Sequence, residues 1–417
     1  MGVLYDAGIR MLGAGIFLLG NCNTKIKRRW KMQQTWEQTL PDCPVDLWMH
    51  CASLGEFDQG LPLLWEYRKA NPKAIILVSF FSPSGFAHYH KRKHCADFVC
   101  VFPLDTRRNA RIFLDKTQPK LVLFVKYEFW LNMLFCIKER KIPLYSVASI
   151  FRKSQPMFQP WGKIFRKGLQ SFSHFFVQND MSLRLLAQIG IHEVTVVGDP
   201  RYDHVLRQKQ SVEEEENSEK HMLILQGICE GHPTLILGSS WAEEERLLRT
   251  CMESLSGWKV ILAPHQVEET HLASIHSLFG ESCIRYSDLE NHTQQQVIVI
   301  DCIGLLHQIY ALGSVAFVGG GFSGKLHNIL EPAVYGLPVL FGPKFDKFPE
   351  AEAFITAGIG FPIKDADSLL DRIQHCFTHQ ENLHKKTKQF IESQQGATEK
   401  IRIGMASKLS RSDFPSN

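Results

Sequence analysis

Two glutamates stand where an apolar stretch gives way to a polar turn, and each can act on a proton or a charge. Glu56 follows the apolar run 45–51 after a turn of small residues and opens a helical stretch. Glu128 follows the apolar run 121–125 and is surrounded by large apolar residues. A carboxylate at a strand end is a candidate general base, and a charge in apolar surroundings must be paired or used. The ordinary alternative for Glu56 is an acid that compensates a helix dipole.

A glycine-rich loop in the second half is typical of anion binding. The apolar run 315–318 is followed by the glycines 319–321, and residues 328–335 are predicted to be helical. Glycines let the main chain lie against a ligand, and free N–H groups at a helix start attract anions. Asn328 and Glu331, in the first helical turn, can bind ribose hydroxyls, although Glu331 can also simply compensate the dipole. We therefore predict a phosphate or nucleotide site here.

Polar residues also end two other strands of the second half. Ser239 and Ser240 follow the run 234–238 and can donate hydrogen bonds to a phosphate. Ser240 precedes three glutamates, so it can equally be a plain helix N-cap. Pro264 and His265 end the next strand, where a lone histidine is usually structural.

The string G-x-G-x-x-G, formed by Gly319, Gly321 and Gly324, raises a nicotinamide enzyme as an alternative. The dinucleotide fingerprint follows the first strand of its unit and precedes an acidic residue by about 20 positions. Here the glycines follow a late strand, so the fit is poor. The eleven cysteines form no Cys-x-x-Cys pair, and the histidines show no zinc-binding spacing. We expect neither a metal nor a cofactor requirement.

The predicted strands and helices that must position these residues alternate along the chain. A length of 417 residues predicts two domains. Apolar runs that predict strands occupy residues 45–51, 74–80, 98–102, 121–125, 142–148, 174–178 and 194–197, and then 234–238, 258–262, 297–300, 315–318 and 338–341. Helical stretches between them predict parallel sheets covered on both faces. The fold class is therefore α/β, with two Rossmann-like domains facing a cleft and ligands at the carboxyl ends of the strands.

The predicted organisation has four parts. Residues 1–30 form a membrane-anchoring or interfacial segment, 31–207 an N-terminal domain, 208–230 an acidic linker and 231–417 a C-terminal domain. The apolar part of the first segment is too short to span a bilayer comfortably, and a basic flank that includes Lys27 and Arg28 follows it. An ordinary first helix packed on the domain is the alternative. A net charge of +4 does not argue for nucleic acid.

Taken in order, the motifs resemble those of the 3-deoxy-D-manno-octulosonic acid (Kdo) transferase family. They are Ala-Ser-Leu-Gly-Glu at 52–56, Glu-Phe-Trp at 128–130, Gly-Asp-Pro-Arg-Tyr-Asp at 198–203, Gly-Ser-Ser-Trp at 238–241, Pro-His at 264–265, Asp-Cys-Ile-Gly-Leu at 301–305 and the segment 319–343. Each motif alone is weak, but their conjunction is specific. The resemblance extends from the N-terminal segment to about Phe361.

The resemblance implies a GT-B fold, CMP-Kdo as donor, the lipid A precursor as acceptor and the cytoplasmic face of the inner membrane as location. It makes Glu56 the catalytic base, and Glu128 and Arg201 the residues that stabilise the transition state. The residues implied to hold CMP are Ser239, Ser240, Pro264, His265, Ile303, Gly304, Leu305, Gly320, Gly321, Asn328, Ile329, Leu330 and Glu331. In-line attack at one site then predicts inversion.

The chain departs from the family pattern at three of these positions. The family often has lysine at the position of Arg201 and arginine at that of His265, and an acid usually stands where Leu305 does. Three other classes stay open: a different GT-B nucleotide-sugar enzyme such as a UDP-sugar transferase or epimerase, an NAD-dependent oxidoreductase, and a non-catalytic membrane-associated sugar-binding protein.

Overall fold

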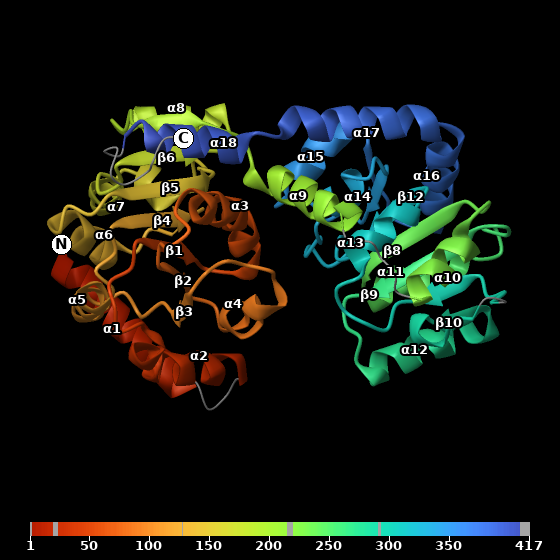
Figure 1. Cartoon of the computed structure of the whole chain (residues 1–417), viewed down its shortest axis with the longest axis horizontal. Helices are drawn as coiled ribbons and strands as arrows, with labels where there is room; N and C mark the ends of the chain where they lie inside the picture. Colours follow the sequence, from red (N-terminus) through yellow and green to blue (C-terminus); the bar gives the residue numbers. More distant parts are fainter. Residues whose placement is uncertain (1, 20–23, 127, 215–219, 291–292, 409–417) are drawn as a thin grey trace. The chain divides into compact units, whose positions relative to one another are not determined.

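The chain forms two compact units, seen here in a computed structural model that describes residues 2–19, 24–126, 128–214, 220–290 and 293–408. The first unit comprises Met1–His204 and Gln395–Asn417, and the second comprises Val205–Gln394. In Figure 1 the first unit runs from red to yellow-green and takes back the dark blue helix α18.

The first unit is built on a seven-stranded parallel sheet in its described residues, with the order β3-β2-β1-β4-β5-β6-β7. The strands are β1 (Leu47–Cys51), β2 (Ile76–Phe80), β3 (Phe98–Val101), β4 (Leu121–Val125), β5 (Leu144–Ser149), β6 (His174–Val177) and β7 (Val194–Val196). The order reverses between β1 and β4, so their carboxyl ends flank the switch point where ligands bind in open sheets.

Both faces of this sheet are covered because successive strand side chains point to opposite sides. Trp48 packs in a core with helices α5 to α8, whereas Leu47 and Met49 pack in a core with α3 and α18. The helices of this unit are α1 (Gly2–Leu19), α2 (Thr24–Gln34), α3 (Leu54–Ala70), α4 (Pro83–His88), α5 (Arg107–Thr117), α6 (Leu131–Glu139), α7 (Lys163–Leu169), α8 (Asp180–Gln188), α9 (Pro200–Glu214) and α18 (Ala397–Ala406), with short 3₁₀ turns η1 (Trp36–Thr39), η2 (Tyr89–Lys91) and η3 (Pro156–Phe158). The unit boundary falls within α9, so only residues 200–204 of that helix belong to the first unit and the rest belong to the second.

The second unit repeats the architecture, with strand order β10-β11-β9-β8-β12-β13-β14. All pairs are parallel. Its strands are β8 (Thr234–Ser240), β9 (Lys259–Pro264), β10 (Cys283–Arg285), β11 (Val297–Val299), β12 (Val315–Val318), β13 (Val339–Phe341) and β14 (Gly360–Pro362). Its helices are α10 (Lys220–Cys229), α11 (Ala242–Cys251), α12 (Glu269–Phe279), α13 (Leu306–Ile309), α14 (Leu330–Ala333), α15 (Pro349–Thr356), α16 (Ala366–Thr378) and α17 (Gln380–Gln394), with 3₁₀ turns η4 (Gly280–Ser282), η5 (Tyr286–Asp288) and η6 (Tyr310–Leu312). Here the switch point lies between β8 and β12.

The structure confirms two α/β units but differs from the predicted limits at the C-terminus. Residues 395–408 group with the first unit and not with the second. Ile401 and Met405 are buried in the same core as β1 and α3, and the Asp203 carboxylate accepts the N–H groups of Gly396 at 2.7 Å and Thr398 at 2.6 Å. The predicted linker is also largely helical, as α9 and α10, although its residues 215–219 lie outside the described part of the chain.

The N-terminal helices pack on the first unit. The Tyr5 hydroxyl donates to Asp105 Oδ2 at 2.9 Å, and Asp6 Oδ1 accepts the Arg107 N–H at 2.8 Å. Further along α1, Met11 is 75% exposed and Leu12 is 52% exposed. Among the described residues, no helix has the length and apolar character needed to cross a bilayer. Residues 1 and 20–23 of the predicted anchoring segment lie outside the description.

Candidate active site

Glu56 stands at the carboxyl end of β1 because only a two-residue turn separates the strand from α3. The Ser53 hydroxyl caps the helix and accepts the Glu56 N–H at 3.4 Å. Glu56 Oε2 in turn accepts the N–H of Ala52 at 2.5 Å. The carboxylate is therefore turned back over the helix start, and Glu56 is 9% exposed.

Glu128 follows β4, the neighbour of β1, and a buried network fixes its carboxylate. Glu128 Oε2 accepts the indole N–H of Trp130 at 2.5 Å and lies 3.3 Å from Nε2 of His50. His50 is fully buried on β1, and its Nδ1 lies 2.9 Å from Oγ of Ser79 on β2. The charge expected among apolar residues is thus hydrogen-bonded, as its burial requires.

The charge of Glu128 acts on Glu56. Burial, and next the charge of Glu128, raise the pKa of Glu56 to about 7, while the Ala52 N–H and the Lys126 charge act in the opposite direction. A carboxylate with a pKa near neutrality is suited to take a proton and release it again. The surroundings of Glu56 therefore fit a general base, which its sequence position alone left undecided.

Arg201 is held beside this pair at the start of α9. Asp199 Oδ2 accepts from Arg201 Nε at 2.9 Å and from Nη2 at 2.7 Å, and Asp199 Oδ1 accepts the Arg201 backbone N–H at 3.0 Å. The Arg201 charge and hydrogen bonds keep the pKa of Asp199 below its usual value despite burial. The amide of Gln59, oriented by the donors that face it, accepts from Arg201 Nε at 3.1 Å and from Lys126 Nζ at 3.2 Å.

We call Glu56, Gln59, Lys126, Glu128 and Arg201 the first-unit site. The sequence predicted three of these residues and missed Gln59 and Lys126, together with the supporting Asp199 and His50. A usable signal existed for Gln59, which lies three residues after Glu56 and so shares its helix face. Asp199 precedes Pro200, a pairing typical of a helix start. Nothing local marks His50 or Lys126, whose roles arise from contacts with residues far away in the sequence.

In the second unit, Ser240 contacts protein groups and not open solvent. Its hydroxyl donates to Glu245 Oε1 at 2.7 Å, and its carbonyl accepts the His265 N–H at 3.0 Å. Ser240 is 1% exposed, so the hydroxyl predicted to hold phosphate is already engaged. Ser239 is partly exposed, and its φ of 53° marks the irregular end of β8.

Three aromatic rings gather where β8, β9 and β12 end. The Trp241 ring stacks on His265 with centroids 4.7 Å apart, and His265 lies 4.4 Å from His327. Trp241 Nε1 donates to His327 Nε2 at 3.2 Å. Burial, and next the neighbouring His265, lower the pKa of His327 to about 4, so this ring is neutral at neutral pH. The Trp241–His265–His327 cluster is a mostly uncharged aromatic surface that the sequence did not predict.

The glycine loop contacts an acidic side chain of the chain itself. The buried Glu244 carboxylate accepts the N–H of Gly320 at 2.8 Å and that of Trp241 at 3.1 Å. Its burial raises its pKa. The Gly320 N–H is therefore already bonded within the protein, and the assignment of Gly320 to CMP binding stays a prediction. Gly319 instead lets the loop approach β8, since a Cβ there would lie 2.2 Å from the Ser239 carbonyl oxygen.

The helix predicted over 328–335 is only the four-residue α14. Asn328 Oδ1 accepts the Leu330 N–H at 3.1 Å, and Asn328 Nδ2 donates to Glu331 Oε1 at 3.1 Å. The Leu330 N–H is therefore already bonded, and so short a helix offers little dipole to an anion. Asn328 and Glu331 nevertheless lie together, as a ribose-binding pair would require.

The remaining predicted nucleotide contacts differ in exposure. The side chains of Ile329 and Leu330 are fully buried in the core. Gly320 and Gly321 are buried as well. Pro264 is buried at the end of β9, and His265 beside it is exposed. Ile303, Gly304 and Leu305 lie on the loop after β11, where Ile303 is 68% exposed and Gly304 has a φ of 105°.

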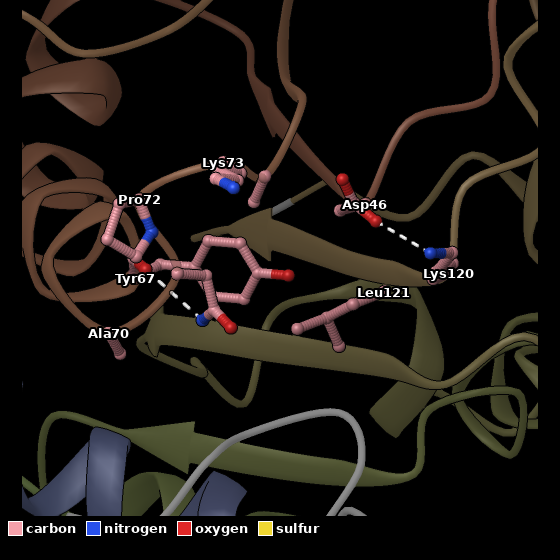
Figure 2. A pocket seen from close by; sticks show the side chains of 9 residues that line it. Asp46, Tyr67, Ala70, Pro72, Lys73, Lys120 and Leu121 are labelled. Carbon is pink, nitrogen blue, oxygen red and sulfur yellow. Dashed lines mark hydrogen bonds and ion pairs between the residues drawn. The ribbon is translucent and has the colours of Figure 1, made fainter.

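A cavity of about 540 Å³ lies at the opposite, amino-terminal edge of the first sheet. Its lining includes Asp46, Tyr67, Lys73 and Lys120, and an ion pair of 2.8 Å joins Lys120 Nζ to Asp46 Oδ1 (Figure 2). No predicted site residue lines this cavity. The residues with chemistry therefore gather at the carboxyl edge, as parallel sheets predict.

The comparisons with known proteins agree with this arrangement. Residues 24–204 match the family model of the 3-deoxy-D-manno-octulosonic-acid transferase (kdotransferase). The 3-deoxy-D-manno-octulosonic acid transferase of Aquifex aeolicus is 25% identical over 341 residues, which cover 81% of this chain and 87% of that protein.

Two further similarities add context. A bifunctional glycosyltransferase/methyltransferase of Fusobacterium nucleatum is 25% identical over 363 residues, or 83% of this chain, and the chain spans only 54% of that protein. The crystal structure of the UDP-GlcNAc 2-epimerase from Neisseria meningitidis covers 87% of this chain and 100% of its own, with a TM-score of 0.62 and 13% identity. The latter likeness shows the fold alone.

Family model and relatives agree on the same transferase, and the matched region carries Glu56, Glu128 and Arg201 in one site. Relatives of the same description cover 84% of this chain in Rickettsia bellii and 74% in Haemophilus influenzae. Residues 24–204 therefore match a Kdo transferase domain, and the chain is similar to Kdo transferases over most of its length, which supports a glycosyltransferase.

Proposed function

We propose that this glycosyltransferase moves Kdo from CMP-Kdo to the lipid A precursor lipid IVA in lipopolysaccharide core biosynthesis, with inversion and without a metal ion. The observation that carries the proposal is the buried Glu56 carboxylate, whose pKa of about 7 suits it to a hydroxyl acceptor. The similarity to Kdo transferases supports Kdo as the transferred sugar.

In the proposed step, Glu56 takes the proton of an acceptor hydroxyl as that oxygen bonds to the anomeric carbon of Kdo. The bond from this carbon to the CMP phosphate oxygen breaks, and CMP leaves with the electron pair. Because attack and departure occur on opposite faces, the anomeric configuration inverts. Arg201 and Glu128 belong to the same site and are proposed to balance the charge that develops there.

The second unit is proposed to hold CMP. The Trp241–His265–His327 cluster offers a mostly neutral aromatic surface of the kind on which bases stack. Asn328 and Glu331 offer an amide and a carboxylate for ribose hydroxyls, and they are already bonded to each other at 3.1 Å. The half-buried Ser239 and the loop 303–305, where Ile303 and Gly304 are exposed, are proposed to contact the phosphate.

The direct test is incubation of the full chain with CMP-Kdo and tetraacylated lipid A precursor. We expect a lipid product heavier by one or more Kdo residues in mass spectrometry, together with release of CMP. Inversion is read from the anomeric configuration of the new linkage by NMR. A matched incubation with UDP-N-acetylglucosamine should yield no lipid product. Turnover of the UDP-sugar with none of CMP-Kdo would contradict the proposal.

We also propose that the N-terminal helices hold the enzyme on the cytoplasmic face of the inner membrane. Exposed Met11 and Leu12 lie on α1, and exposed Lys27, Arg28 and Lys31 lie on α2, which packs against it. Exposed apolar side chains on one helix and a basic stripe on the next are typical of segments that bind at the surface of an anionic bilayer.

Replacing Lys27 and Arg28 by glutamine should weaken binding to phosphatidylglycerol vesicles about 30-fold, since each basic residue near an anionic surface contributes about 1 kcal/mol. Vesicle co-sedimentation measures this, with phosphatidylcholine vesicles as the neutral comparison. The control replaces Lys385 and Lys386, two exposed lysines of α17, by glutamine. Equal losses in both variants would show that general charge, and not the α2 stripe, drives binding.

A further inference from the structure

Lys126 is the residue of the first-unit site whose backbone is unusual. It follows β4 with a φ of 62°, a conformation that costs a non-glycine residue about 1 kcal/mol. The surrounding structure holds it there: the Lys126 N–H donates to the Val147 carbonyl at 2.9 Å, and its own carbonyl accepts from Ser149 Oγ at 3.1 Å. The side chain is thus fixed next to the switch point of the sheet.

The ammonium group meets Gln59, one helical turn after Glu56 on α3. The same amide oxygen accepts from Lys126 Nζ at 3.2 Å and from Arg201 Nε at 3.1 Å, so one neutral group gathers two cations. Arg201 also has the bidentate partner Asp199, which compensates its charge.

The charges around Lys126 come from several elements. Glu56 begins α3, Glu128 follows β4, and Asp199 with Arg201 begins α9. The Lys126 charge acts on both Glu56 and Asp199 and favours their ionised forms. A substrate anion arriving next to Glu56 would meet two carboxylates, and a cation is needed to offset their repulsion.

The transferred sugar brings such an anion. An octulosonic acid carries its carboxylate on the anomeric carbon itself, and that is the carbon the acceptor oxygen attacks while Glu56 takes the proton. We propose that Lys126 Nζ binds this carboxylate and so selects an acidic sugar over a neutral one. The inference rests on the proposed function and deepens it, because it assigns the feature of the donor that the first-unit site recognises.

The test compares two donors, CMP-Kdo and its analogue in which the sugar carboxylate is a primary carboxamide. Wild-type enzyme should prefer the acid by about 10- to 100-fold in kcat/KM, the range expected for one charge-assisted hydrogen bond. Lys126→Met should reduce this ratio to near one, chiefly by losing activity with the acid. Lys126→Arg keeps the charge and should keep part of the preference.

Lys141→Met is the matched control, since Lys141 is another lysine at positive φ, 58°, and stands in the exposed turn after α6. It should leave the donor ratio unchanged. If Lys126→Met lowers both donors equally, or only shifts the acid limb of the pH profile upward, Lys126 merely supports or tunes Glu56 and the inference is overturned. If wild-type enzyme makes no Kdo-lipid from CMP-Kdo, the proposed function itself fails.

Discussion

Glu56→Gln is expected to lower kcat for Kdo transfer by about 10²- to 10⁴-fold, the contribution of a positioned general base. Glutamine keeps the size of the side chain, and its oxygen can still accept the Ala52 N–H that Glu56 accepts at 2.5 Å. The loss therefore reports the missing base and not a damaged fold. Steady-state kinetics of CMP release measure it, and Glu66→Gln, later on the same helix, should leave kcat intact.

The pH profile gives the same prediction a second readout. With a pKa of about 7, Glu56 is increasingly protonated as the pH falls below 7, so kcat/KM should drop tenfold per pH unit on that side. The acid limb should vanish in Glu56→Gln. A variant that keeps wild-type turnover, or keeps the limb, would remove Glu56 from the role of base.

The raised pKa of Glu56 also predicts that its ionised carboxylate destabilises the folded protein. Folding raises the Glu56 pKa from 4.5 to about 7, so between these values the native state holds a proton that the unfolded chain has lost. The free energy of unfolding then falls as the pH rises through this window, by on the order of 3 kcal/mol. Glu56→Gln should therefore be more stable than wild type at pH 8 in urea unfolding, while being nearly inactive.

Gly319→Ala is expected to destabilise the second unit by about 3 kcal/mol, at the upper end for an overpacked site. The new Cβ would lie 2.2 Å from the Ser239 carbonyl oxygen and 2.9 Å from the Ser240 Cα, and both are backbone atoms that cannot rotate away. Thermal unfolding followed by circular dichroism should show an earlier transition.

Gly227→Ala is the matched control, and it is expected to increase the stability of the protein. Gly227 is exposed in α10 and a Cβ there meets nothing within 4 Å. Alanine should stabilise this helix by about 0.5–1 kcal/mol through its better helix propensity. If Gly319→Ala proved as harmless as Gly227→Ala, the close approach of the glycine loop to β8 would be wrong.

Most strands were predictable because buried parallel strands are continuous apolar runs. All seven strands predicted for the first unit and all five predicted for the second unit are confirmed to within two residues at each end. The sequence missed β10 and β14, which are only three residues long at the two edges of the second sheet. Gly360 and Pro362 in β14 are residues that argue against a strand unless it is an edge.

The site was less predictable where its residues form hydrogen bonds with other residues of the protein. Glu56, Glu128 and Arg201 came from motifs, and the structure brings them together at one sheet edge. The hydrogen bond from the Gly320 N–H to Glu244 could not be predicted from the sequence, because 76 positions separate the two residues. The glycine loop thus makes an internal contact, which no local pattern distinguishes from ligand binding.

The return of α18 to the first unit has a consequence for synthesis. Ile401 and Met405 belong to the core that also contains β1 and α3, yet the ribosome makes them only after all of Val205–Gln394. Domains generally fold in the order in which they emerge. Here the N-terminal unit begins first but finishes second, because part of its core is still untranslated while the contiguous second unit has every residue it needs.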